Sequence, residues 1–401
     1  MSEKVPSPNQ ESSDHGLVGY LGPTPPLGQL PPRGERLWVE RPEQLQQAVS
    51  VLSRSQIVAI DAEFTQVRSR TQQQENESSV PRLALLQLAI DQRCFVVDTL
   101  RLQDLSPLAA VVANPAIATL LHGAGADLRV MAERGLYVAH YYDLEATCRS
   151  IFGQHESSLA AMLRRAFHSH LDKSLQRTDW TRRPLPPAMI AYAARDAEVT
   201  LALYYWLKQH YEPVLQLHEN TAQLEKVALW IEPFLRGTAT TSPEIAVAEA
   251  RTQGIIQKKS QVVSDCRAAL AAVTHPMRRN RLLRLIADLS LIQLAPDILP
   301  LLHALTSDER AGSARTLGRL GVKSAREELQ LLLQDQVQDV RKAAQTALRN
   351  LDDKDQRQQQ RSPTTKAIDG SRTWIVENDG QAGASDDDQS WKARLRSMID
   401  S

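Results

Sequence analysis

Residues 57–64, IVAIDAEF, place two acids, Asp61 and Glu63, directly after four apolar residues. Such an apolar run predicts a buried strand. Residues i and i+2 of a strand point to the same face, so the two carboxylates should lie side by side. Neighbouring buried carboxylates resist ionisation unless a cation lies between them. Because hard divalent metals prefer oxygen ligands, the pair predicts a metal site at the strand end; a solvated strand end without function is the alternative.

The segments that follow predict more strands and the helices that cover them. Residues 83–90 and 94–97 are apolar and are separated by three polar residues, which predicts two strands joined by a short turn. Residues 117–121 predict another strand. Residues 104–113, 125–134 and most of 156–208 predict helices, so the pattern indicates an α/β fold.

Three further residues could complete an acidic site. Tyr192 and Asp196 are four apart on a predicted helix and therefore share a face. A phenol beside a metal-bound carboxylate can hold or deprotonate a water molecule. Asp127 follows an apolar strand and a glycine-rich turn, near the start of a helix. Taken singly, each has a structural alternative: a half-buried tyrosine, a surface acid, or an acid placed favourably near a helix N-terminus.

These motifs occur in the order that is typical of the DEDDy 3′→5′ exonucleases. The chain resembles ribonuclease D and its relatives, over about residues 37–210. Residues 81–89, PRLALLQLA, resemble the second strand of that family, and residues 173–185, KSLQRTDWTRRPL, resemble its K-x-x-Q-x-x-D-W-x-x-R-P-L segment. The resemblance implies an RNase H-like mixed sheet flanked by helices. It also implies hydrolysis from a 3′ end with release of 5′-phosphomonoesters, and trimming of tRNA-type 3′ ends is favoured.

The resemblance implies a role for each candidate residue. Asp61, Glu63 and Asp196 would hold the metal ion that carries the attacking water, Asp61 would bridge to a second metal, and Asp127 would help to hold that second ion. Tyr192 would orient or deprotonate the water. The two ions would be Mg²⁺ or Mn²⁺, about 3.5–4 Å apart. Five side chains could contact substrate. Phe64 and Leu128 could pack on terminal bases, and three basic residues could contact phosphates: Lys173, Arg182 and Arg183.

The exonuclease domain is assigned to residues 36–212, and four segments lie outside it. Residues 1–35 are rich in proline and predict a disordered arm. Residues 213–260 predict a helical linker. Residues 261–352 predict an all-α domain, and residues 353–401, rich in Gln, Asp and Ser, predict a disordered tail.

The all-α domain contains a repeat. Similar segments begin at Arg279, Arg310 and Arg341, at a spacing of 31 residues. A helix pair of this period predicts an α-solenoid and resembles short HEAT-like repeats. Because solenoids offer concave surfaces, the repeats could bind a protein partner. The four arginines within residues 278–284 form a basic stripe that could contact nucleic acid or lie on a solvated face.

The composition limits the remaining classes of protein. The formal net charge is zero, so any nucleic-acid site must be a local basic patch. Three widely spaced cysteines argue against a disulfide framework or a zinc cluster, and they indicate a reducing compartment, the cytoplasm. No stretch approaches the roughly 20 apolar residues of a membrane span, so no membrane partner is expected.

Three functions remain open. An enzyme acting on RNA with a free 3′ end is favoured. The same chemistry on DNA is the alternative, because nothing in the sequence reads the 2′-hydroxyl group. A catalytically silent scaffold that binds nucleic acid or protein through the repeats is the third, and it need not keep all four acids and Tyr192.

Overall fold

The computed structural model describes residues 25–65, 81–171, 175, 178–221 and 225–360. Lys173, most of the predicted arm and most of the predicted tail lie outside these ranges. The chain divides into two units, Met1–Asp355 and Gln356–Ser401. The features below belong to the first unit; the described part of the second is helical.

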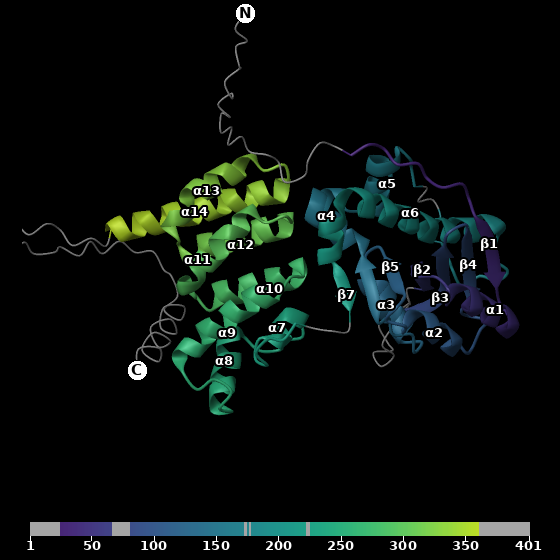
Figure 1. Ribbon diagram of the computed structural model, residues 1–401, viewed down its shortest axis with the longest axis horizontal. Coiled ribbons are helices and arrows are strands. Elements are labelled where there is room, and N and C mark those ends of the chain that lie inside the picture. Colours follow the sequence, from purple (N-terminus) through teal and green to yellow (C-terminus); the bar gives the residue numbers. More distant parts are fainter. Residues whose placement is uncertain (1–24, 66–80, 172–174, 176–177, 222–224, 361–401) are drawn as a thin grey trace, which may run out of the picture. The chain divides into compact units, whose positions relative to one another are not determined.

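Seven strands in the described ranges form one mixed sheet, in the order β1-β4-β3-β2-β5-β6-β7 (Figure 1). The antiparallel centre consists of β2 (Ile57–Thr65), β3 (Arg82–Ile90) and β4 (Arg93–Asp98). The parallel strands β5 (Ala118–Leu121) and β6 (His140–Asp143) extend it beyond β2, and the edges are β1 (Glu35–Val39) and β7 (Glu219–Thr221). The expected RNase H-like mixed sheet is confirmed.

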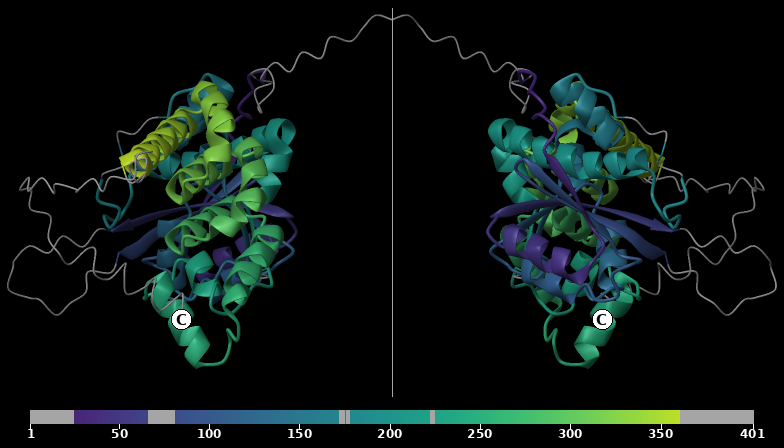
Figure 2. Two further views of the ribbon diagram at one scale, coloured as in Figure 1. Left: turned by 90° about the vertical axis from the view of Figure 1, so that its left-hand side faces the viewer. Right: turned by 90° about the vertical axis from the view of Figure 1, so that its right-hand side faces the viewer.

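Helices cover both faces of this sheet (Figure 2). One face carries α4 (Leu144–Phe152), α5 (Leu159–Phe167) and α6 (Pro187–Leu217). The other carries α1 (Pro42–Leu52), α2 (Ala109–Val112) and α3 (Gly125–Ala132). Ala59 belongs to the core under α6, whereas Val58 and Ile60 belong to the opposite core. Because side chains alternate along a strand, Asp61 and Glu63 project toward α6.

The sheet continues beyond the predicted domain boundary at residue 212. Helix α6 runs through Pro213 to Leu217, and β7 then pairs antiparallel with β6. Tyr211 has non-helical torsion angles, with φ of −139°, so the break comes two residues before the proline. Pro213 therefore lies in the first turn of a new helical piece, where its missing N–H leaves no bond unmade. The first residues of the predicted linker thus complete the sheet.

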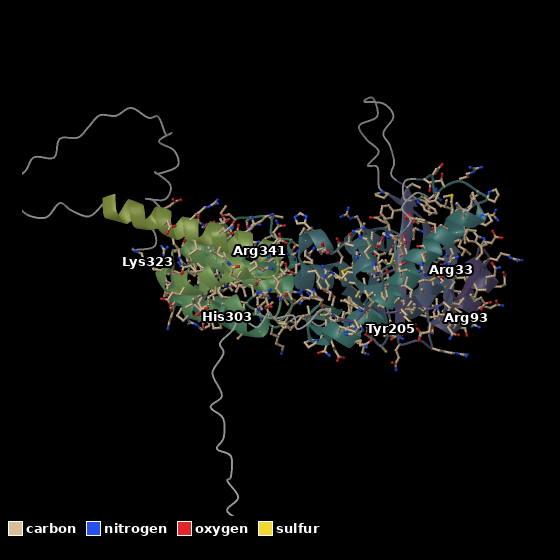
Figure 3. The ribbon with its side chains drawn as sticks, turned by 90° about the horizontal axis from the view of Figure 1, so that it is seen from above. Arg33, Arg93, Tyr205, His303, Lys323 and Arg341 are labelled. Atoms are coloured by element: carbon tan, nitrogen blue, oxygen red, sulfur yellow. The ribbon has the colours of Figure 1, made fainter. Side chains whose placement is uncertain are left out.

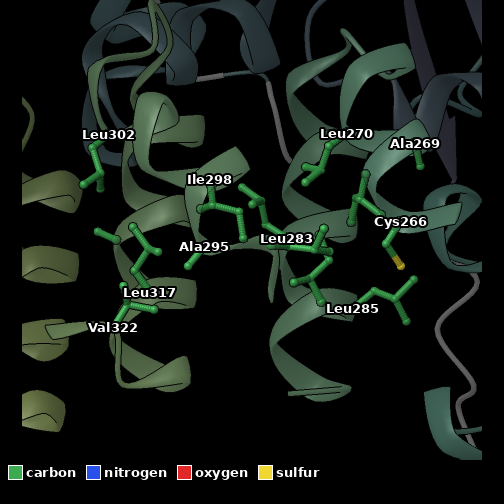
Figure 4. Close-up of a cluster of buried hydrophobic side chains, with 14 of the residues drawn as sticks. Cys266, Ala269, Leu270, Leu283, Leu285, Ala295, Ile298, Leu302, Leu317 and Val322 are labelled. Carbon is green, nitrogen blue, oxygen red and sulfur yellow. The ribbon is translucent and has the colours of Figure 1, made fainter. Parts of the chain in front are cut away.

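The remaining described residues are helical: α7 (Glu232–Arg236), α8 (Pro243–Thr252), α9 (Lys259–Ala272), α10 (Pro276–Asp288), α11 (Ala295–Ile298), α12 (Ser307–Leu320), α13 (Arg326–Leu331) and α14 (Gln338–Gln360). The long helices begin at residues 276, 307 and 338, which reproduces the 31-residue period. Cys266, Leu283, Ile298 and Leu317 share one core (Figure 4). The expected all-α domain is confirmed, and its kinship with HEAT repeats stays a prediction.

Among the residues searched, those that the structure describes, no helix combines the length and apolar character needed to span a bilayer.

Candidate active site

Three of the predicted acids meet between β2 and α6. Carboxylate oxygens of Asp61, Glu63 and Asp196 all lie within 4.8 Å of one another. Strand β2 extends to Thr65, past the acids that were expected at its end, and its register against β3 shifts between Glu63 and Phe64. Such an irregularity re-aims the side chains beside it. The sheet and one long helix therefore hold the three carboxylates in one cluster.

Burial makes these carboxylates reluctant to ionise. Burial, followed by the charges of Asp196, Asp127 and Glu63, raises the pKa of Asp61 well above its usual value. Burial and the charges of Asp196 and Asp127 raise the pKa of Glu63 to about 8. A divalent cation would supply the positive charge that the cluster lacks, and its preference for oxygen ligands matches the donors. The residues therefore fit a metal site.

Asp127 faces the same region from the first turn of α3. It is 7% exposed, and burial together with the charge of Asp143 raises its pKa to about 7. The turn before it passes through Gly123, whose φ of +81° lies in the region that favours glycine. The Asp143 carboxylate accepts hydrogen bonds from the N–H groups of Gly123, at 3.0 Å, and Ala124, at 3.3 Å. Asp127 is outside the three-residue cluster, but its charge acts on Asp61 and Glu63.

Tyr192 lies one helical turn before Asp196 on α6, as the spacing predicted. Its ring is half-buried and stacks at a tilt on Trp180, with ring centroids 6.1 Å apart. Trp180 is 3% exposed and comes from the segment that precedes α6. The tryptophan therefore helps to fix the orientation of the Tyr192 ring.

The residues predicted to contact substrate differ in how far they are buried. Phe64 and Leu128 are half-buried and pack against the core that lies on the α3 face of the sheet. Arg182 is exposed, whereas Lys173 lies outside the described residues. Phe64, Leu128 and Arg182 each keep surface that a substrate could contact.

Arg183 is held inside the protein. Its guanidinium donates to both carboxylate oxygens of Asp98, at 2.6 and 2.7 Å. It also donates to the carbonyl oxygens of Ala84, Trp180 and Arg182. These bonds occupy all five N–H donors of an arginine. The geometry therefore favours a structural role, which ties the segment before α6 to β3 and β4, over the predicted phosphate contact.

Replacing Arg183 with glutamine is expected to lower the free energy of unfolding by about 3 kcal/mol, because Asp98, at 0% exposure, would keep its buried charge without its main partner. Urea denaturation followed by circular dichroism would measure the change. Arg182→Gln is the matched control: its side chain is exposed, and a change within about 0.5 kcal/mol is expected. Equal stability of the two variants would contradict the structural role.

The sequence did not single out Gln87, although it stands in an otherwise apolar run. This residue lies opposite Asp61 on β3 and is fully buried, and neither amide atom has a hydrogen-bond partner among the described residues. Directly opposite side chains in a sheet lie about 5 Å apart at Cβ. An unsatisfied buried amide costs about 1–3 kcal/mol, so its place beside the carboxylates fits a site that a ligand completes.

Comparison with known proteins identifies the segment that builds this site. Residues 37–212 match the family model described as 3′-5′ exonuclease. The chain is 32% identical over 167 residues to Protein RRP6-like 3 of Arabidopsis thaliana, which covers 41% of this chain and 18% of that protein. It is 35% identical over 175 residues to ribonuclease D of Gluconacetobacter diazotrophicus, covering 42% of each.

A further relative and a solved structure match different shares of the chain. Ribonuclease D of Haemophilus influenzae is 30% identical over 153 residues, covering 38% of this chain and 36% of that protein. The crystal structure of Escherichia coli RNase D aligns with a TM-score of 0.41 and 21% identity, covering 80% of this chain and 75% of that one. The chain thus spans less than half the length of the curated relatives named here. Residues 37–212, which build the acidic cluster, are thus similar to 3′-5′ exonuclease domains, those of ribonuclease D among them.

Proposed function

We propose that the chain is a metal-dependent 3′→5′ exoribonuclease that hydrolyses phosphodiester bonds one nucleotide at a time and releases 5′-phosphomonoesters. The observation that carries this proposal is the convergence of Asp61, Glu63 and Asp196 at a half-buried point between β2 and α6. RNA is favoured over DNA because relatives at 30–35% identity are named ribonuclease D. Trimming of tRNA-type 3′ ends is the reaction we favour.

The DEDDy assignment gives each residue a part. Asp61, Glu63 and Asp196 would hold one divalent ion and Asp127, with Asp61, a second, either Mg²⁺ or Mn²⁺. When bound, such a pair lowers the pKa of a coordinated water and stabilises the charge on the attacking and leaving oxygens. Tyr192, one turn from Asp196, is placed to accept a hydrogen bond from the attacking water or to take its proton.

The substrate strand would meet surfaces around these acids. Phe64 and Leu128 retain exposed apolar surface, which could stack on terminal bases without reading their sequence. Arg182 is free to contact a phosphate, and Lys173 would join it if the predicted motif holds. We also infer a cytoplasmic location, because all three cysteines are free thiols.

A time course on two matched substrates tests the proposal. One RNA and one DNA strand with 3′ overhangs, labelled at the 5′ end, would be incubated with Mg²⁺, Mn²⁺ or EDTA. We expect a ladder that shortens from the 3′ end, faster on RNA, and that EDTA abolishes. A faster ladder on DNA would transfer the proposal to the deoxy substrate.

The absence of a ladder on either strand, with no metal binding by calorimetry, would favour the alternative, a scaffold that binds nucleic acid or a protein partner through the repeats. The charge cluster argues against that alternative, since a scaffold gains nothing from three half-buried carboxylates that repel one another.

A further inference from the structure

We propose that a groove lined by arginines between α4, α10 and α12 binds the phosphate backbone of a single RNA strand whose 3′ end lies at the acidic cluster. This inference rests on the proposed exonuclease function and assigns part of its substrate binding to the all-α domain. The arginine groove has a volume of about 540 Å³ and is lined by five arginines and one acid: Arg149, Arg281, Arg284, Arg315, Arg319 and Asp308.

The repeat brings the arginines together. Arg284 on α10 and Arg315 on α12 occupy equivalent repeat positions, 31 residues apart. Arg315 and Arg319 lie on one face of α12, because residues four apart on a helix are neighbours. The floor of the groove needs Gly312: a Cβ there would lie 1.9 Å from Oδ1 of Asn280. The glycine therefore lets α10 and α12 approach closely, so that two rows of arginines face one space.

The positive charge of the groove is only partly neutralised. Among the described residues, no salt bridge to the side chain of Arg149 or Arg315 is formed, and the charges of both act on the nearby Asp308 carboxylate. The Arg284 side chain is 81% exposed and lies 4.0 Å from Asp288, which pairs at 2.7 Å with Arg319. The Asp308 carboxylate is engaged by the Ser150 hydroxyl. Five arginines thus face two acids, which favours an anionic ligand.

Neighbouring basic side chains are already engaged, so the groove is not simply part of a uniformly basic surface. Within the predicted stripe, Arg278 and Arg279 pair with Glu225 and Glu309. Figure 3 labels two basic side chains elsewhere in the helical region, Arg341 and His303. Arg341 donates to the carbonyl oxygens of Asp335 and Gln336, and the His303 ring lies 2.7 Å from the Glu328 carboxylate. Arg278 and Arg279, which pair with glutamates, therefore lie outside the groove, whereas Arg281 and Arg284 line it.

The lining favours a nucleic acid strand over an acidic protein segment. None of the residues lining the groove is aromatic, whereas protein interfaces depend on aromatic anchors. Guanidinium groups match phosphate oxygens through two parallel hydrogen bonds, and a strand repeats that acceptor at regular steps. Arg281 shows the required rigidity, because its guanidinium donates to the Leu235 carbonyl at 2.7 Å.

One helix connects the groove with the catalytic acids. Arg149 lies six residues beyond Asp143, the N-cap of α4, which corresponds to about 9 Å along the helix axis. The same Asp143 carboxylate binds the turn that leads into Asp127. A strand whose terminal phosphate lies at the acids could therefore place phosphates nearer its 5′ end over Arg149 and the two repeat helices.

Binding of a 5′-fluorescein-labelled oligoribonucleotide of about 20 nucleotides, measured by anisotropy in EDTA between about 50 and 200 mM salt, tests this inference. The variant is Arg284→Glu with Arg315→Glu. We expect its affinity to fall on the order of ten-fold, and the salt slope of log K to shrink by about 1.4, because each phosphate contact contributes about 0.7 on single strands.

The matched control is Arg251→Glu with Lys258→Glu, two exposed residues at α8 and α9 that lie outside the groove and give the same change in charge. It should bind with an unchanged salt slope. If both double variants lose affinity equally, the effect is one of total charge and the inference fails. It also fails if Arg284→Gln with Arg315→Gln, a gentler pair for the case that the reversals disturb folding, keeps the full slope.

The inference and the proposed function can fail separately. If the protein hydrolyses RNA but the groove variants keep the full salt slope of log K, the inference is wrong and the proposed exonuclease function is unaffected. A slope that depends on the groove, in a protein that hydrolyses neither RNA nor DNA, would support the binding site and overturn the proposed function.

Discussion

Replacing Asp61 with asparagine is expected to lower turnover on RNA by at least about three orders of magnitude. The substitution keeps the shape of the side chain but removes one of the charges that would hold the divalent ions. Stabilisation of the transition state by such ions is worth several kcal/mol, and each 1.36 kcal/mol is about a factor of ten in rate. Single-turnover hydrolysis of a 5′-labelled RNA with Mn²⁺ would measure the loss. Asp196→Asn should act in the same direction, because its carboxylate belongs to the same cluster.

The same substitution should stabilise the metal-free protein. The charges of Asp196, Asp127 and Glu63 all disfavour ionisation of Asp61, so removing its carboxylate relieves repulsion that folding imposes. Asp91→Asn is the matched control, since this exposed aspartate lies at the β3–β4 turn, away from the cluster, and should leave turnover unchanged. An Asp61→Asn protein within ten-fold of normal turnover would rule out the metal assignment.

Metal-free protein is expected to lose at least about 2 kcal/mol of unfolding free energy as the pH rises from 6.5 to 8. The pKa of Glu63 is raised from 4.5 to about 8, so the folded protein binds a proton that the unfolded chain has released. The stability from that proton is complete below pH 4.5 and is lost as the pH rises through 8. Asp127, with a pKa raised to about 7, adds to the loss.

The interval from pH 6.5 to 8 largely separates the destabilisation by Glu63 and Asp127 from the pH dependence that two buried histidines cause. Burial lowers the pKa of His218 to about 3 and of His275 to about 4, so only the unfolded chain binds these protons as the pH falls below 6.5. Their contribution to stability therefore rises mainly below pH 6.5, and each histidine adds only about 0.4 kcal/mol above it, which is smaller than the carboxylate effect. Chemical denaturation in EDTA at both pH values would measure the carboxylate effect. Saturating Mn²⁺ should abolish the loss, and an unfolding free energy that rises toward pH 8 in EDTA would contradict the prediction.

The sequence predicted the centre of the sheet and failed at its edges, for a physical reason. Because β2, β3 and β4 are buried, each contains a long apolar run, and such runs predict strands. β6 and β7 have four and three residues, polar or half-exposed, and carry no alternation of apolar and polar residues. Such short strands at or next to a sheet edge are defined by their partners, which a local pattern does not contain. Pro213 normally ends a helix, but the break at Tyr211 lets the helix resume and lead to β7.

In the candidate site too, the sequence revealed the residues that local periodicity brings together and missed those that only the fold brings together. Asp61, Glu63 and Asp196 could be found because strand and helix periodicities put reacting groups on one face. The role of Arg183 could not, because its partner Asp98 lies 85 residues away and only the fold brings them together. Asp143 was missed although its place before Leu144-Glu145-Ala146 is a signal for a helix N-cap, and its carboxylate accepts from the N–H groups of Glu145 and Ala146.

The position of β7 limits how the nuclease can be moved between proteins. The family match ends at residue 212, but the sheet ends at Thr221, so a gene fusion cut at the family boundary would leave out the last strand. The β6 backbone groups that pair with residues 219–221 would then be open to other chains, which is a route to aggregation. His218, the residue before β7, is buried and its ring lies 2.8 Å from Ser150, whose hydroxyl engages Asp308 of the all-α domain. A version of this domain that folds in another protein therefore has to keep β7 and also the contacts that His218 and Ser150 make with the all-α domain.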